Sequence, residues 1–269
     1  MSYIALNTAA TGMNACSTSL DVIANNLANA NTTGFKSSRA NFEDLFYQEF
    51  AQPGIQSGDA IQRPTGLYVG LGTQVSGTQL DFRQGAAEAT GKPFDLMIEG
   101  DGFFQLQISP DVGDGIGYTR AGNFTLNQEG EIVLANSPGW RLEPEISIPE
   151  DASNINVSQD GVVTGNVPGQ VDPVEFGTIL LARFINPTGL ETIGNNTYIP
   201  TEASGEPLEA QPNQEGFGAV RQGFLEASNV DPVTELVSLI KTQRTFEMNS
   251  QVIQASNETL QNITNLAIR

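Results

Sequence analysis

The sequence predicts an α+β protein with a discontinuous helical coiled-coil domain built from both termini, a mainly antiparallel β head domain, and an extended β/loop arm joining the two. Two observations carry this prediction. Apolar residues recur at helical spacing near each end of the 269-residue chain, whereas short apolar runs separated by Gly, Pro, Asn and Asp fill the middle.

The first helix is expected from about residue 4 to residue 29. Its apolar residues follow alternating steps of three and four, at Leu6, Ala9, Met13, Cys16, Leu20, Ile23 and Leu27. The other faces carry Ala, Ser, Thr and Asn, where a solvated helix normally carries Lys and Glu. We therefore expect contacts on several sides, and an end near Asn29, before Gly34.

A second, longer helix is expected to begin at Asp231, which can cap it, with Pro232 at the first helical position. Leu236, Leu239 and Ile240 start the expected buried face. Apolar residues then recur every seven positions, at Leu239, Phe246, Ile253, Leu260 and Ala267. A polar row beside this stripe, at Gln243, Ser250, Asn257 and Thr264, favours a multi-helix wall or a water-filled lumen over an isolated two-stranded zipper.

Between the helices, helical periodicity is lost. Residues 37–50 are either a short helix or an extended arm, and the Gly, Gln and Pro residues that follow predict turns and extended strands. From about residue 74 to residue 225 the pattern predicts an antiparallel barrel or sandwich with long loops. The clearest expected strands are 94–98, 103–108, 117–120, 131–135, 179–184 and 197–199.

Composition excludes several classes of function. The chain has no His and one Cys, so His-based catalysis, His metal ligands and an intrachain disulfide are ruled out. The formal charge is -19, and residues 37–230 hold 26 acids and 8 bases, which disfavours nucleic acid and anionic membranes as partners. Cys16 lies on the helical stripe and is expected to be a small buried apolar residue.

Targeting signals are also weak. No base precedes Lys36, so a cleaved secretory signal is not expected, and no apolar run approaches the roughly 18 residues of a membrane span. We expect either a cytoplasmic protein or one exported without cleavage of its N-terminus, and no membrane insertion.

Other motifs have ordinary explanations. The glycines at 70, 72, 113, 115 and 117 lack the spacing and the following Lys of a nucleotide loop, so turns are expected. Asp111 and Asp114 lack the full pattern of a calcium loop. Glu143 and Glu145 are a chance pair among many acids and no convincing hydrolase dyad. We expect no enzyme activity, no cofactor and no metal.

Several ordered motifs resemble the bacterial flagellar rod and hook protein family. Residues 21–29, Asp-Val-Ile-Ala-Asn-Asn-Leu-Ala-Asn, and 33–36, Thr-Gly-Phe-Lys, are similar to its N-terminal signature, and residues 228–230 and 243–249 to its C-terminal one. Residues 100–104 and 118–124 resemble its head-domain motifs. The motif residues carried over from this resemblance are Asn25, Asn26, Leu27, Asn29, Gly34, Phe35, Lys36, Asn229, Gln243, Arg244, Glu247 and Asn249. Phe246 departs from the family's usual Tyr, and Cys16 from its usual polar residue.

Residues 42–72 resemble a segment of the family's distal-rod members, which is implied to lock neighbouring subunits and keep the rod straight. Its marker residues are Phe42, Leu45, Tyr47, Pro53, Gly54, Pro64, Gly66, Gly70 and Gly72. A typical hook protein would carry further outer domains.

The resemblance implies a self-assembling subunit of the distal rod, a stiff hollow drive shaft that carries torque to the hook and contains the export channel. Implied partners are copies of itself, proximal rod proteins, the hook or its junction, the P and L rings, and the type III export apparatus. The implied location runs from the periplasm to the outer membrane. A proximal rod or hook-type axial subunit is the alternative, followed by a surface adhesin or binding module and by a glycan-acting enzyme.

Three regions are expected from these patterns. Residues 1–36 and 230–269 would form the polymerisation domain, residues 37–73 and 210–229 the connecting arm, and residues 74–209 the head. The residues expected to drive self-assembly are Leu6, Met13, Leu20, Ile23, Leu27, Leu236, Leu239, Phe246, Ile253 and Leu260.

Overall fold

A computed structural model describes residues 2–53, 65–110, 113, 115–136, 138–170, 172–214 and 216–267. The chain divides into two compact units. Residues 1–28, 38–79 and 231–269 form one, here called the helical unit, and residues 29–37 and 80–230 form the other, called the β unit. This division differs from the predicted boundaries in two respects: most of the predicted arm belongs with the helices, and residues 29–37 belong with the β unit. The three-part organisation stays a prediction.

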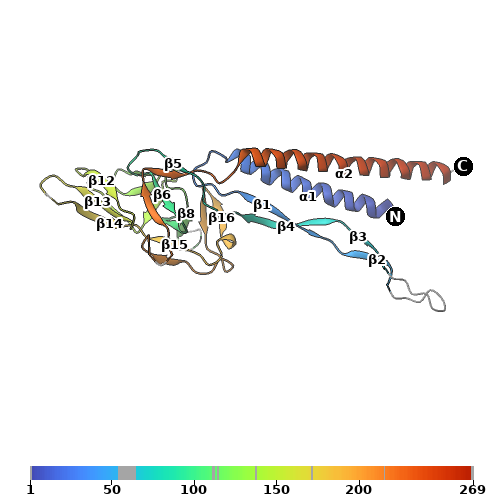
Figure 1. Ribbon diagram of the computed structural model, residues 1–269, viewed down its shortest axis with the longest axis horizontal. Helices are drawn as coiled ribbons and strands as arrows, with labels where there is room; N and C mark the ends of the chain where they lie inside the picture. Colours follow the sequence, from blue (N-terminus) through green and yellow to red (C-terminus); the bar gives the residue numbers. More distant parts are fainter. Residues whose placement is uncertain are drawn as a thin grey trace. The chain divides into compact units, whose positions relative to one another are not determined.

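The helical unit contains both terminal helices. α1 (Ser2–Ala28) and α2 (Pro232–Ala267) pack against each other and run in opposite directions, as Figure 1 shows. α1 ends close to where the accumulation of Asn and Thr predicts. Neither helix, over its described residues, is long and apolar enough to cross a membrane.

The start of α2 is capped as predicted. The Asp231 carboxylate accepts hydrogen bonds from the Val233 backbone N–H (3.1 Å) and the Thr234 hydroxyl (2.6 Å). The bond from Val233 satisfies a backbone N–H that has no partner within the first turn of the helix. Pro232 follows at the first helical position, where its missing N–H costs nothing.

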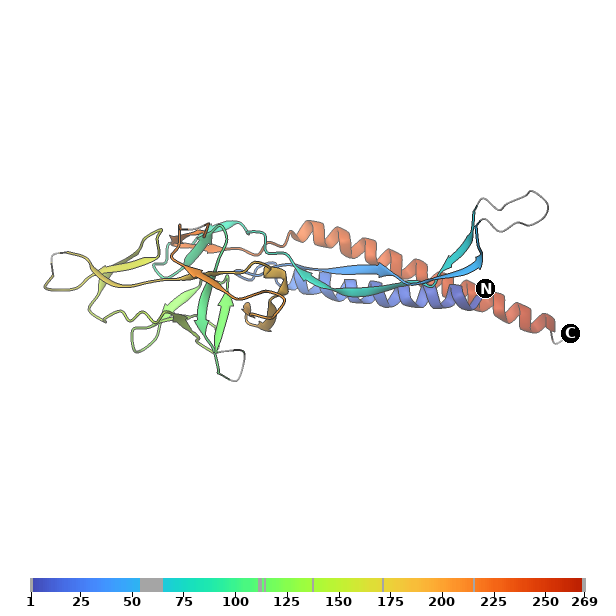
Figure 2. The same cartoon turned by 90° about the horizontal axis from the view of Figure 1, so that it is seen from below.

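Two short antiparallel ribbons complete the helical unit. β1 (Ser38–Asp44) pairs with β4 (Thr73–Leu80), and β2 (Tyr47–Ala51) pairs with β3 (Leu67–Gly70). β1 contacts α1, and both views show the ribbon strands (Figure 2). Of the two predictions for residues 37–50, the strands exclude the short helix, and the connecting arm stays a prediction.

The β unit is mainly antiparallel, as predicted. Its central sheet has nine strands, with β7 (Phe103–Gln107) bonded to both β8 (Ile116–Thr119) and β11 (Arg141–Glu143) and also to β15 (Leu181–Arg183). The other strands of this sheet are β9 (Phe124–Leu126), β10 (Ile132–Leu134), β16 (Glu191–Gly194), β17 (Thr197–Ile199) and β18 (Leu208–Ala210). The main path runs from β16 to β9 and is open at both ends, so the described strands form no closed barrel.

Smaller sheets surround this one. β12 (Ser153–Val157), β13 (Val162–Asn166) and β14 (Val174–Thr178) form a three-stranded sheet. β19 (Ala219–Gln222) pairs with β6 (Leu96–Glu99), and β20 (Phe224–Glu226) pairs with β5 (Ala87–Ala89). A short 3-10 helix, η1 (Pro187–Gly189), precedes β16.

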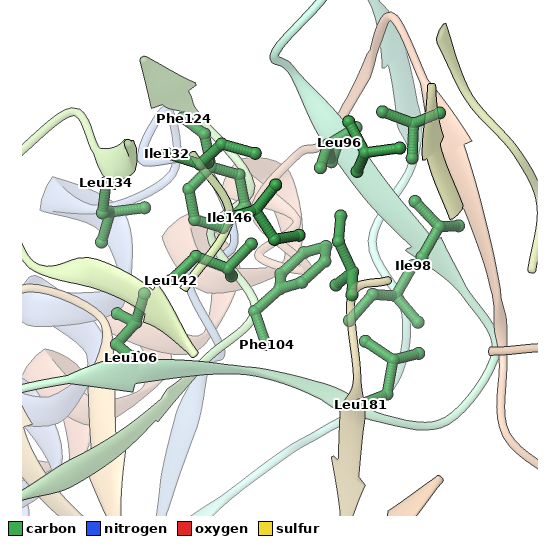
Figure 3. Close-up of a cluster of buried hydrophobic side chains, with 14 of the residues drawn as sticks. Leu96, Ile98, Phe104, Leu106, Phe124, Ile132, Leu134, Leu142, Ile146 and Leu181 are labelled. Carbon is green, nitrogen blue, oxygen red and sulfur yellow. The ribbon is translucent and has the colours of Figure 1, made fainter. Parts of the chain in front are cut away.

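The core of the β unit follows from the alternation of side chains along β7. Phe104 and Leu106 point to one face and are fully buried in a large aliphatic cluster with Leu96, Leu142 and Leu181 (Figure 3). Phe104 also meets Phe124 edge to face, with ring centroids 5.2 Å apart. On the opposite face, Phe103 belongs to a second, aromatic cluster.

We predict that Phe104→Ala lowers the free energy of unfolding of the β unit by about 3–5 kcal/mol, because it leaves a cavity in this cluster. Urea unfolding of the full chain, followed by fluorescence of Trp140, measures the change. The control is Ile185→Ala, whose side chain is 83% exposed, with an expected change of about 0.5 kcal/mol or less. Equal effects of the two variants would contradict this placement of the core.

The start of α2 should weaken in acid. Hydrogen bonds from Thr234 and Val233 lower the pKa of Asp231 below its usual value of 3.8. Between the lowered and the usual pKa the unfolded carboxyl binds more protons, so the cap's stabilisation is full above 3.8 and is lost as pH falls through the lowered pKa. Hydrogen-exchange protection at Val233 should therefore fall in this window. Asp231→Asn should flatten the pH dependence, and an unchanged profile would contradict the cap.

Candidate functional site

The helical unit gathers the predicted self-assembly residues without covering them fully. On α1, Ile23 is buried, and Leu6, Met13, Leu20 and Leu27 are half-buried. On α2, Leu239, Ile253 and Leu260 are half-buried, whereas Leu236 and Phe246 are exposed. The prediction that Leu236 and Ile240 belong to a buried face is wrong within the single chain, where both side chains are exposed. That these residues drive self-assembly stays a prediction, but much of their apolar surface is available to other chains.

Asn249, one of the motif residues, lies where the helices approach closely. A Cβ at Gly12 would stand 2.9 Å from the Asn249 Nδ2 atom, so glycine allows this approach. Asn249 also lines two mostly apolar cavities, of about 380 and 360 Å³. Phe50 of β2 contributes to the first and Phe42 of β1 to the second, so both cavities lie between the helices and the ribbons.

Cys16 lines the second cavity. Its side chain is half-buried, and burial raises the pKa of the thiol. This environment favours the neutral thiol over the reactive thiolate.

Within residues 42–72, two backbone hydrogen bonds lie where the β1–β4 ribbon meets the β2–β3 ribbon. Leu45 N–H donates to the Gly72 carbonyl (2.9 Å), and Leu71 N–H donates to the Phe46 carbonyl (3.1 Å). Gly72 has φ +124°, and a side chain there would overlap the Thr11 hydroxyl of α1. Only glycine therefore lets the ribbon pass so close to this helix.

The remaining markers of this segment line or flank the β2–β3 ribbon. Tyr47 faces Gly70 across the ribbon, and a Cβ at Gly66 would lie 2.5 Å from the Tyr68 ring. Pro53 is exposed in a turn. Gly54 and Pro64 lie outside the described residues.

Asn26 connects three parts of the helical unit. Its Nδ2 group donates to the Ser38 carbonyl (2.7 Å) and the Glu235 carboxylate (3.3 Å), and its Oδ1 accepts from the Ser38 N–H (3.0 Å). The side chain is 2% exposed. One buried amide thus joins α1, the start of β1 and the first turn of α2. Its neighbours Asn25 and Leu27 are less buried.

In the β unit, the chain after α1 is fastened by a buried ion pair. Lys36 Nζ lies 2.6 Å from Glu226 Oε1, and neither side chain is more than 1% exposed. Lys36 also donates to the Arg83 carbonyl (2.8 Å), and Glu226 Oε1 accepts from the Gly85 N–H (2.8 Å). Burial lowers the pKa of Lys36, and attraction to Glu226 opposes that shift.

Arg120 extends this pair into a cluster of three charges. Its guanidinium is 3.7 Å from Glu226 Oε2, donates to the Gly100 carbonyl (2.8 Å), and stacks over the Phe103 ring at 5.2 Å. Burial lowers the pKa of Arg120. Burial together with the Glu226 charge raises the pKa of Tyr198 in the adjoining aromatic cluster.

Gly34, near the start of the β unit, and Asn229, near its end, both lie beside the Lys36–Glu226 pair. Asn229 Oδ1 accepts from the Ser37 N–H (2.7 Å), and its Nδ2 donates to the Asp81 carbonyl (2.7 Å). Gly34, with φ +69°, donates its N–H to the Glu226 carbonyl (2.7 Å). A Cβ on Gly34 would lie 2.7 Å from the Ala121 backbone, so a larger residue does not fit.

The motif residues thus form separate groups. Lys36, Gly34, Phe35 and Asn229 meet in the β unit, and the Phe35 carbonyl accepts from the Asn229 N–H (3.3 Å). Asn29 closes a turn with Thr32 through a backbone and a side-chain hydrogen bond. Gln243, Arg244 and Glu247 are exposed on α2. Nothing in this arrangement resembles a catalytic constellation, and the described residues hold no cluster of three metal-ligating acids or thiols.

Sequence reasoning missed two sets of residues that the structure brings together. The ion pairs of Glu226 with Lys36 and Arg120 were not predicted, because they join positions far apart in the chain, although Arg120 lies within the 118–124 motif. The second set lies on the face of α2 that points away from α1. Its members, at Val233, Val237, Ile240, Arg244 and Met248, are all exposed. Their spacing of four, three, four and four residues was the available signal.

We predict that Glu226→Gln destabilises the β unit by about 3–5 kcal/mol, because it leaves the buried Lys36 cation uncompensated. Urea unfolding of the full chain measures this loss. Adding Lys36→Met should recover part of it, since the buried charge is then removed. The matched control, Glu99→Gln, breaks the exposed pair with Arg221 and should cost about 1 kcal/mol at most. Similar losses from Glu226→Gln and Glu99→Gln would contradict the importance of the buried pair.

Three family models match the chain in order. Residues 6–36 match the flagella basal body rod protein model, residues 97–165 the flagellar hook protein FlgE/F/G D1 domain, and residues 221–266 the flagellar basal body rod FlgEFG protein C-terminal model. The first and last contain the residues that meet around Lys36 and Asn229.

Similar proteins cover nearly the whole chain. The flagellar basal-body rod protein FlgG of Caulobacter vibrioides is 43% identical over 96% of this chain and 97% of its own length. In Bacillus subtilis, FlgG is 39% identical over 95% of this chain and 96% of its own length, whereas the flagellar hook-basal body complex protein FlhP is 29% identical over 94% and 95%.

A solved structure, the Helicobacter pylori flagellar hook protein FlgE2, aligns over 71% of this chain and 43% of its own, with 12% identity and a TM-score of 0.24, too low to add to the argument. With three ordered motif regions and about 42% identity to relatives over almost its full length, the chain belongs to the FlgG-type flagellar basal-body rod proteins.

Proposed function

We propose that this protein is a structural subunit of the distal part of the flagellar rod. Copies would polymerise into a stiff, hollow helical drive shaft that transmits motor torque to the hook and encloses the export channel. The full-length similarity to FlgG proteins, 39–43% against 29% for FlhP, carries the proposal. A proximal rod or hook-type axial subunit is the second candidate, because the D1 domain model is shared by hook and rod proteins. A surface adhesin is a weaker third candidate.

The helical unit supports polymerisation on physical grounds. α1 carries Asp21 as its single charged residue, and α2 leaves several large apolar side chains exposed, among them Val233 (72%) and Met248 (57%). Such surfaces are poorly solvated in a free monomer and gain free energy when another chain covers them. A contact between two different surfaces of identical copies generates a helical filament wherever the rotation between copies does not close into a ring.

The proposal includes further partners and a location. The rod would lie in the basal body between the periplasm and the outer membrane, inside the P and L rings, and would join proximal rod proteins at one end and the hook or its junction at the other. Export would proceed through the flagellar apparatus without cleavage of a signal. The excess of acids in residues 37–230 suits a surrounding ring with a basic inner surface, which would centre the shaft without tight contacts. The protein would act without enzymatic activity or a cofactor.

Residues 42–72 are proposed to stiffen the shaft. A two-stranded ribbon alone is marginally stable in water, so one that exposes aromatic residues requires another surface. Contacts of the ribbon with neighbouring copies would supply that surface and would also restrict bending between subunits.

We predict that Ile253→Asp abolishes rod assembly and swimming while the β unit stays folded, because it places a charge on the half-buried stripe of α2. Electron microscopy of purified basal bodies and swimming in soft agar measure assembly, and Trp140 fluorescence monitors the β unit. The matched control is Gln254→Asp, which adds the same charge at the next, exposed position and should assemble. Normal rods from Ile253→Asp would refute the assembly role of this stripe.

A further inference from the structure

One face of α2 is left uncovered by the part of the chain that the structure describes. Val233, Val237, Ile240, Arg244 and Met248 recur along the side of the helix that points away from α1, and we call them the outer stripe. The apolar members are 44–72% exposed. Across the described residues, no carboxylate lies within ion-pair distance of the Arg244 guanidinium. An exposed apolar stripe is poorly solvated, and a single cation within it can bind a carboxylate of another surface.

The β2–β3 ribbon presents a complementary face. Antiparallel pairing places Tyr47 opposite Gly70 and Glu49 opposite Tyr68, on one face, because side chains alternate along a strand. The other face carries Val69, which lines the cavity against the chain's own helices together with Phe50 and the backbone of Gly70. Tyr47, Glu49 and Tyr68, here called the outer ribbon face, therefore point away from those helices. All three are exposed, with Tyr47 at 59% and Tyr68 at 50%.

The two surfaces match in chemistry. A guanidinium binds a carboxylate through two parallel hydrogen bonds and stacks on aromatic rings, and the outer ribbon face offers a carboxylate between two tyrosines. The aliphatic members of the outer stripe would pack against the same rings. Residues 42–53 carry three acids and no base, so the ribbon's charge is opposite to that of Arg244.

We propose that the outer stripe of one copy is covered by the outer ribbon face of a second copy, with Arg244 paired to Glu49 between Tyr47 and Tyr68. Both surfaces point away from the helix pair of their own chain, so the contact joins different copies. Because the two surfaces differ, the contact propagates and does not close into a dimer. The proposal rests on the proposed polymer and identifies where the ribbon docks in it.

Charge reversal tests the pairing in cells that carry the full-length protein as their sole copy. Arg244→Glu and Glu49→Arg should each lower the yield of complete rods at least about tenfold, since like charges then face each other at every contact. The double variant R244E/E49R should restore rods and swimming. The control double variant, R244E/E43R, reverses an exposed acid of the neighbouring strand β1 and should not restore them.

Crosslinking provides a second measurement. In a Cys16→Ser background, Val237→Cys combined with Tyr47→Cys should give disulfide-linked oligomers in isolated rods. The pair Val237→Cys and Ile185→Cys, whose second position is 83% exposed in the β unit, should not.

The possible outcomes separate the two proposals. Normal assembly of R244E, or equal failure of both double variants with no crosslinks, overturns the docking while leaving the rod function intact. Absence of the wild-type chain from isolated rods overturns the rod function itself.

Discussion

The buried ion pair between Lys36 and Glu226 is the constraint on which the rest of the β unit depends. Lys36 belongs to the segment that follows α1, and Glu226 to the segment that precedes α2, so the pair joins the entry and the exit of the chain. Asn229 reinforces it by holding Ser37 and Asp81 through its amide. Because the segment after α1 and the segment before α2 are joined, a long β-rich region can lie in the chain between two helices that pack against each other.

This arrangement is valuable for specificity more than for stability. Removing two charges from water costs several kcal/mol for each ion, and their attraction repays that cost only when the geometry and the surrounding hydrogen bonds are good. Glu226 Oε2 lies 3.7 Å from the Arg120 guanidinium and accepts no hydrogen bond, so the attraction within the cluster exceeds the cost of desolvation by little at most. If the two segments paired in another register, Lys36 or Glu226 would be buried without a partner. An unpaired buried charge costs far more free energy than the buried pair. The cluster therefore disfavours wrong pairings of the entering and exiting segments.

The fold was predictable wherever local chemistry determines it. Asp231 and Pro232 mark the start of α2 because capping needs neighbouring residues alone, and Phe104 and Leu106 mark a strand because alternation is local. The pairing of Lys36 with Glu226 spans 190 positions and leaves no periodic signal. The outer stripe gave no clear signal for another reason. Arg244 interrupts its apolar pattern, whereas Leu239 and Phe246 belong to an uninterrupted seven-residue repeat on the same helix.

The contrast between apolar and charged side chains also bears on how a charge-poor helix pair can assemble in one defined register. Apolar side chains such as Val237 and Met248 favour any neighbour that covers them, because the hydrophobic effect has no direction. A guanidinium is different, since burying it without a carboxylate is costly. One arginine within an otherwise apolar stripe therefore rejects most positions along a partner surface and accepts those that offer an acid. A polymer that must be stiff needs such selection at every contact, because alternative registers of similar energy would allow the shaft to bend. In the proposed contact, the sparse charge on α2 would select one geometry, and the apolar residues around it would provide most of the binding energy.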